Sequence, residues 1–177
     1  MALRPFVATR QGRVAVILVG VVVWHIGPVG WSQVVGDEAE MDRLKAKAEE
    51  AMANDDSEGA AMSMGRAALM AKQLAMKHKD TLSSARVYQA AEALFRSQEH
   101  AYRAMALFRR AGGQLPASSG VCGSLALAQS NLHHATSLLG QEGNLMAPLA
   151  ERAEHLRESA DDWGTVIASM VTDYQCP

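Results

Sequence analysis

The sequence predicts an all-α protein of about seven antiparallel helices, arranged as stacked hairpins, after an N-terminal hydrophobic segment. Three observations support this fold class. Beyond the first 36 of the 177 residues, alanine and methionine supply much of the apolar content, and both favour helices. Larger apolar residues return at intervals of three and four, as on a buried helix face. Short polar or glycine-bearing joints separate these stretches and make neighbouring helices antiparallel.

The first 36 residues form a separate region, and residues 37–177 form the expected helical domain. Three arginines, Arg4, Arg10 and Arg13, precede the uncharged stretch Val14 to Gly36, and acidic residues follow from Asp37. This order is typical of a segment that inserts into a membrane with its amino terminus in the cytoplasm. We therefore expect export, with the helical domain in the periplasm or another extracytoplasmic space.

A cleaved signal peptide is one interpretation of this segment. The strongest apolar run, Val14 to Trp24, has the length of a signal-peptide core and is short for a membrane span. Gly30 and Ser32 provide small residues at positions minus three and minus one of a cut before Gln33. Under this interpretation, residues 1–32 are absent from the mature protein.

A retained anchor is the second interpretation. All of residues 14–36 would then cross the inner membrane as one tilted helix, with Trp24 and Trp31 near its outer interface. A buried core strand is a third interpretation, but no later segment resembles a strand that could pair with it. The sequence leaves the choice between cleavage and retention open.

The helices are expected over seven stretches: 37–53, 58–78, 82–96, 98–111, 118–139, 145–159 and 161–173. The joint at 54–57 provides an amino-terminal cap for the second helix. Basic residues at 77–79 suit the negative end of that helix dipole, and 80–84 caps the third helix. These joints delimit the first two hairpins.

Later joints follow the same rules. Ser97 is expected to begin the fourth helix, and the pair Gly112 and Gly113 to end it in a left-handed cap. Pro116 prevents the helix from resuming. Asn144 caps the sixth helix, and an aspartate at 161 or 162 caps the seventh.

One stretch has the spacing of a known repeat. Counted from Ala85 with a period of 34, the signature positions hold Tyr88, Ala91, Glu92, Phe95, Ala104, Phe108, Ala111 and Pro116. Residues 85–116 therefore resemble one tetratricopeptide (TPR) repeat, although Glu92 stands where a small residue is usual. The neighbouring frames hold no comparable set. An unrelated helical bundle is the alternative.

The TPR resemblance implies a groove that holds a segment of a partner protein. The matching groove positions are Arg86, Gln89, Ala93 and Arg96, which share one helical face. The candidate partner-binding residues are Arg86, Gln89 and Arg96, because two guanidiniums beside an amide could clamp an acidic segment. The alternative is a solvated face on which these arginines pair with Glu92 or Glu99.

Composition and motifs argue against nucleic-acid binding, metal binding and catalysis. A net charge of −2 with a pI near 6.3 gives no overall attraction to nucleic acid. The histidines show no metal-binding spacing, so no metal or cofactor is expected. Five methionines between 52 and 76 could suit copper, but core packing is the simpler reading. No nucleophile motif or phosphate-binding loop occurs, so we expect no enzyme.

The two cysteines, Cys122 and Cys176, could form a disulfide in an oxidising compartment and fasten the carboxyl-terminal tail. Together with the export segment and the helical repeat pattern, this favours an exported, non-catalytic adaptor that docks another protein. The alternative is a single-pass anchored accessory subunit of a bacterial membrane protein complex, in which residues 14–36 are retained.

Overall fold

The computed structural model describes residues 29–141 and 144–177, and all regular structure within them is helical. The helices of these residues are α1 (Val29–Ala53), α2 (Ser57–Lys77), α3 (Leu82–Arg110), α4 (Ser119–Leu139) and α5 (Ala147–Asp173). The all-α prediction is therefore confirmed for the described part of the chain. The expected number of seven helices is not confirmed. The predicted helices 82–96 and 98–111 form the single helix α3, and the predicted helices 145–159 and 161–173 form the single helix α5.

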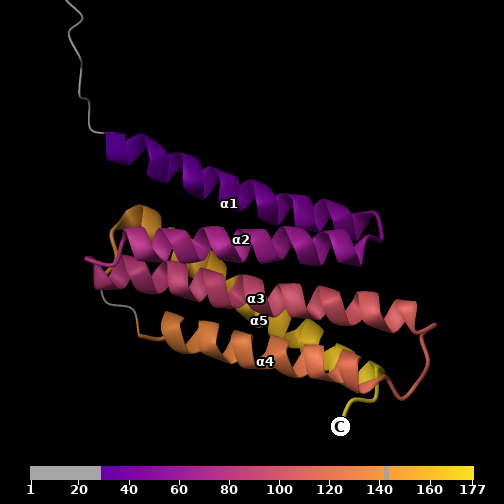
Figure 1. Cartoon of the computed structure of the whole chain (residues 1–177). Coiled ribbons are helices and arrows are strands. Elements are labelled where there is room, and N and C mark those ends of the chain that lie inside the picture. Colours follow the sequence, from indigo (N-terminus) through magenta and orange to yellow (C-terminus); the bar gives the residue numbers. More distant parts are fainter. Residues whose placement is uncertain (1–28, 142–143) are drawn as a thin grey trace, which may run out of the picture.

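The central helix of the fold is α3. It packs against α2, α4 and α5, whereas α1 packs along α2 alone. Figure 1 shows α1 to α4 following one another across the view, with α5 behind α3 and α4. Consecutive helices are antiparallel, as short joints predict. The backbones of α1 and α5 do not pack on each other, and a cleft lined by side chains of both helices lies between them.

Alanine closes the seam between the first three helices. Ala60, Ala67 and Ala71 of α2 and Ala90 of α3 are fully buried, together with larger side chains such as Leu94. Small residues at the contact let helix axes approach closely. A second core lies at the other end of the bundle, where its larger buried members are Val121, Leu125, Ile167 and Met170.

The predicted break at Ser97 is wrong, because α3 continues through it. No glycine or proline occurs between Leu82 and Arg110 to end the helix. Ser97 is buried, and its hydroxyl donates to the carbonyl oxygen of Ala128 on α4 at 2.8 Å. The serine therefore joins two helices instead of capping one. Residues 85–116 consequently do not form the helical hairpin that a TPR repeat requires.

The predicted break at residues 161–162 is also absent. Ala153, Ala160, Ile167 and Met170 are buried along one uninterrupted face of α5. This face packs across both cores, and tertiary packing of an amphipathic face outweighs a local capping preference. The two aspartates stay exposed in mid-helix.

The amino-terminal boundary differs from the expected one. Helix α1 begins at Val29, before the predicted start at Asp37, so the candidate cut before Gln33 falls within this helix. Most of the predicted signal or anchor, residues 1–28, lies outside the described residues. Among the described helices, none combines the length and hydropathy needed to cross a membrane.

Two predicted joints have the expected chemistry. Asp56 caps α2 by accepting a hydrogen bond from the backbone N–H of Gly59 at 2.8 Å. Gly112 and Gly113 follow α3 with φ of 73° and 68°, a left-handed conformation that glycine adopts without the cost other residues bear. These local signals mark the start of α2 and the end of α3.

A disulfide joins Cys122 on α4 to Cys176 in the carboxyl-terminal tail, with 5.4 Å between their Cα atoms. Tyr174 stacks on Phe108 of α3 beside it, and its carbonyl oxygen accepts from the backbone N–H of Ala117 at 2.9 Å. A bond that closes a loop of this length stabilises the fold by about 4 kcal/mol in the chain-entropy view. It fixes the carboxyl-terminal end of α5.

Candidate functional site

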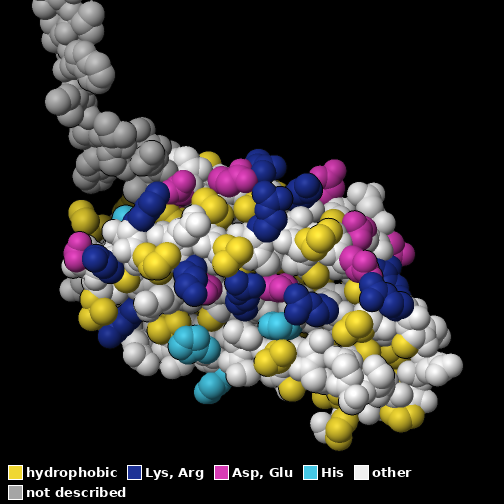
Figure 2. Space-filling model, in the orientation of Figure 1, with side chains coloured by type: hydrophobic (Ala, Val, Ile, Leu, Met, Phe, Trp, Pro, Cys, Tyr) yellow, Lys and Arg dark blue, Asp and Glu magenta, His cyan; other side chains and the backbone are white. Residues whose placement is uncertain are grey.

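An exposed apolar row runs along α2. Met62, Leu69 and Met76 are 69%, 49% and 57% exposed, although large apolar side chains of a helix are usually buried. They are seven residues apart, so they lie nearly in line on one face. Figure 2 shows hydrophobic side chains in a row over α2. Exposed apolar side chains in a row are a candidate contact surface.

A row of arginines runs beside it on α3. Arg96, Arg103 and Arg110 are also seven residues apart. Arg96 and Arg103 both donate to the Glu99 carboxylate, at 2.7 and 2.6 Å, so two guanidiniums share one negative charge. Figure 2 shows Lys and Arg side chains along this side of the hydrophobic row. We call the two rows together the α2–α3 face.

Glu99 lies buried between these helices because α2 has a glycine opposite it. A Cβ atom on Gly65 would lie 3.0 Å from the carboxyl carbon of Glu99. A cavity of about 430 Å3 lies alongside, lined by Met62 and Leu107 as well as by Arg103. The α2–α3 face is therefore grooved, with apolar and basic side chains on its borders.

The structure places all three predicted partner-binding residues on α3, toward α4. Gln89 and Arg96 line one shallow cavity of about 390 Å3 between α3 and α4. Arg86 instead donates to the carbonyl oxygen of Gln141 at 2.7 Å, just after α4. Arg96 pairs with Glu99, as the solvated-face alternative predicts. The Arg86 guanidinium is therefore already engaged, and a clamp formed by all three residues stays a prediction. Only Arg96 belongs to the α2–α3 face.

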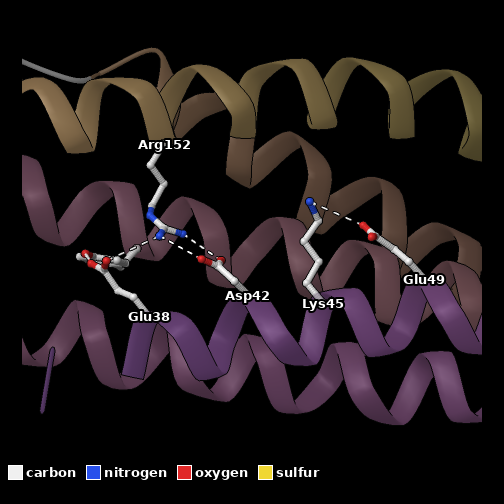
Figure 3. Close-up of polar contacts among 6 residues, drawn as sticks. Glu38, Asp42, Lys45, Glu49 and Arg152 are labelled. Carbon is white, nitrogen blue, oxygen red and sulfur yellow. Dashed lines mark hydrogen bonds and ion pairs between the residues drawn. The ribbon is translucent and has the colours of Figure 1, made fainter. Parts of the chain in front are cut away.

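A polar network spans the cleft between α1 and α5. Arg152 of α5 donates to Asp42 of α1 at 3.1 and 3.3 Å and lies 3.6 Å from Glu38. Figure 3 shows Arg152 reaching from α5 toward these two carboxylates, with Lys45 farther along α1. Glu38 also accepts a hydrogen bond from the hydroxyl of Tyr88 on α3.

This network ties three helices together. Burial, with the hydrogen bond to Glu38, raises the pKa of Tyr88 above its ordinary value, so its hydroxyl remains a donor. Arg152 is the only described side chain of α5 that forms ion pairs with α1. The network therefore holds α5 against α1 at one end of the cleft and leaves the rest of the cleft open.

Two cavities of about 320 and 390 Å3 occupy the cleft, and both are lined by Lys45, His155 and Ser159. Gln98 of α3 lies beneath the larger one and is 1% exposed. Its Nε2 lies 3.4 Å from the hydroxyl oxygen of Ser159. Its Oε1 has no hydrogen-bond partner among the described residues. We call the two cavities together the α1–α5 cleft.

Sequence reasoning missed both Arg152 and Gln98. A signal existed for the first, because Glu38 and Asp42 are four residues apart and so share one face of α1. Two neighbouring carboxylates on a helix call for a cation from elsewhere. No local signal existed for Gln98, because its surroundings come from three different helices.

The described residues hold no group of three His, Cys, Asp or Glu side chains that could bind a metal ion. The clustered methionines do not converge either, because Met64 is buried in the core while Met62 and Met76 are exposed. Both findings refer to residues 29–141 and 144–177.

Comparison of the chain with protein-family models, with curated proteins and with solved structures finds no match.

Proposed function

We propose that this chain is an exported, non-catalytic adaptor that binds a helix of another protein on the α2–α3 face. The observation that carries the proposal is the exposed row of Met62, Leu69 and Met76 beside a row of arginines with the same spacing. Each row repeats about every 10.5 Å along its helix and is about 21 Å long. A partner helix with a seven-residue repeat would match both rows in register.

The two rows define the chemistry of this partner. Its apolar residues, seven apart, would contact the row on α2, and glutamates or aspartates beside them would contact the arginines on α3. Arg96 and Arg103 share Glu99, and Arg110 pairs with Glu58. Three arginines therefore face two carboxylates, and positive charge is in excess on this side. An acidic amphipathic helix therefore complements the face in shape, spacing and charge.

The free energies of burial and of association show why both rows are needed. Burying one half-exposed Leu or Met side chain stabilises a complex by roughly 1 to 1.5 kcal/mol. Three such side chains together only approach the cost of association, which is at least about 4 kcal/mol. The charges beside the row provide specificity, orientation and faster association.

The disulfide supports the exported location. Cys122 and Cys176 are paired, and such bonds persist in oxidising compartments outside the cytoplasm. The basic, apolar and acidic order of the first 40 residues points to the same location. We place the helical domain in the periplasm or an equivalent space.

Two exposed leucines provide a matched test. Leu69 lies on the α2–α3 face and is 49% exposed, whereas Leu127 lies on α4 and is 51% exposed. Affinity purification from the native source should recover a partner with the wild-type chain and with Leu127→Asp. Leu69→Asp should lose that partner, because an aspartate in the apolar row opposes both the apolar contact and the acidic helix.

Two further readouts test the same proposal. Capture should weaken as NaCl is raised from about 0.05 to 0.5 M, because the arginines are exposed enough to be screened. Arg86→Glu should leave capture intact, since Arg86 is bonded to Gln141 away from the face. Equal recovery of the partner by Leu69→Asp and Leu127→Asp would eliminate this site.

A further inference from the structure

The larger cavity of the α1–α5 cleft has walls rich in negative charge. Three carboxylates line it, Glu49 from α1 and Glu158 and Asp162 from α5. Two basic side chains also line it, but both are engaged. Lys45 lies 3.6 Å from Glu49, and the His155 ring lies 3.5 Å from Glu158. The Asp162 carboxylate forms no ion pair with any described residue, so negative charge is in excess.

The floor of this cavity offers an unsatisfied acceptor and aromatic surface. The Oε1 atom of Gln98 is buried without a hydrogen-bond partner in the described part of the chain. A buried polar atom without a partner costs about 1 to 3 kcal/mol. Beside it, the rings of Tyr102 and Trp163 meet edge to face, with centroids 5.1 Å apart.

The acidic character extends to the aromatic floor. Burial, and after it the charge of Glu49, raises the pKa of Tyr102 to about 12. Negative potential therefore reaches the ring, which itself presents a negative face to a cation. Carboxylates, an amide oxygen and aromatic faces together stabilise a cation that can also donate hydrogen bonds.

We propose that this cavity binds a primary or secondary alkylammonium group, as carried by a free polyamine or by a lysine side chain of another protein. The ammonium would donate to Gln98 Oε1 and pair with Asp162, while its methylenes would contact Tyr102 and Trp163. This site is separate from the α2–α3 face, and its chemistry is opposite in charge. The inference therefore goes beyond the proposed docking of a helix.

An anion would not suit this cavity. Lys45 is the only permanently charged cation among its described lining residues, and it is already paired. A quaternary ammonium would suit it less well than a primary one, because it has no N–H group to donate to Gln98. This difference separates the proposed site from general attraction of cations to an acidic surface.

The test is calorimetric titration of the purified full chain, with its disulfide intact, against two probes. One probe is spermidine, and the other is a short glycine peptide with a single lysine. Binding of one equivalent of either probe supports the site, and the probe that binds more tightly identifies the source of the ammonium. A peptide with trimethyllysine in place of lysine should bind about fivefold more weakly.

Neighbouring aspartates provide the matched control. Asp162→Asn should weaken binding of the better probe about tenfold, because it removes the unpaired carboxylate. Asp161→Asn, which lines a different cavity together with Leu132 and His133 of α4, should change the affinity less than about twofold. Failure of both probes to bind, or equal weakening by the two substitutions, would overturn the proposal.

Gln98→Leu distinguishes a binding role from a structural one. Replacing this buried amide, whose oxygen is unsatisfied and whose nitrogen has one long hydrogen bond, by an apolar side chain of similar volume should raise the melting temperature. The same substitution should weaken ammonium binding severalfold, because the acceptor is gone. Unchanged affinity in a well-folded Gln98→Leu variant would contradict the proposed role of its oxygen.

Discussion

The α2–α3 face and the α1–α5 cleft are both bordered by α3, yet they differ in shape and charge. On the face, two arginines share one buried glutamate and an apolar row is exposed. In the larger cavity of the cleft, three carboxylates surround a floor of one amide and two aromatic rings. The difference follows from packing. Alanines bring α2 and α3 together, whereas α1 and α5 are connected by the long side chain of Arg152.

The two proposals together describe a protein that holds two partners at once. The proposed acidic helix would occupy the face, and the proposed cationic ligand would occupy the cleft. Because the two places prefer opposite charges, neither ligand would compete for the other site. The cleft keeps its shape only while α5 is held in position. Substitutions of the contacts at the two ends of α5 should therefore change the cleft.

The largest expected effect is at the carboxyl-terminal end of α5. The double substitution Cys122→Ala with Cys176→Ala should lower the free energy of unfolding by about 4 kcal/mol. Urea denaturation of the oxidised wild type and of the variant measures this. Because the cleft is formed by α5, ammonium binding should weaken as well. A loss below about 1 kcal/mol would mean that the stacked Tyr174 and Phe108 hold the tail without the disulfide.

A smaller effect is expected at the other end of α5. Arg152→Ala leaves Glu38 and Asp42 close together without their cation, beside the buried Tyr88. We expect a loss of about 2 kcal/mol in the free energy of unfolding, below the full value for a buried pair because the site is partly solvated. Lys47→Ala on the exposed side of α1 is the control and should change stability by less than about 0.5 kcal/mol.

The smallest effect concerns the α2–α3 face. Glycine in a helix is less favourable than alanine by up to about 1 kcal/mol, so Gly123→Ala in α4, with open space around it, should stabilise the fold. Gly65→Ala should fall short of that gain by about 1 kcal/mol, because its methyl group would press on Glu99, which two arginines hold. Thermal unfolding of both variants measures the difference. Equal stabilisation would show that Glu99 moves freely.

Sequence reasoning identified the ends of α2 and the left-handed glycines after α3, because these signals act within a few residues. It failed at Ser97, where a typical capping residue lies inside a helix. The serine hydroxyl donates to the carbonyl oxygen of Ala128 on another helix. A local sequence pattern cannot predict a contact between residues so far apart in the chain. The repeat resemblance depended on a turn at this position, so it was lost with the turn.

The predicted partner-binding residues show the same limit of sequence reasoning. Arg96 was predicted for partner binding, and it lies on the α2–α3 face. Arg86 was predicted on equal grounds, because it shares the helical face of Arg96, yet its guanidinium is bonded to Gln141. Spacing places residues on a common face, but it does not determine which neighbouring atoms will occupy their hydrogen bonds.

The sequence by itself determined that this chain is helical and alanine-packed beyond its first residues, because helix propensity and apolar periodicity are local properties. It also determined the ends of helices where glycine or aspartate acts on the adjacent backbone. Only the tertiary structure decided that α3 and α5 are continuous, and that Gln98 lies under a cleft walled by α1 and α5. Burial, charge balance and unsatisfied polar atoms at that cleft arise from residues far apart in the chain.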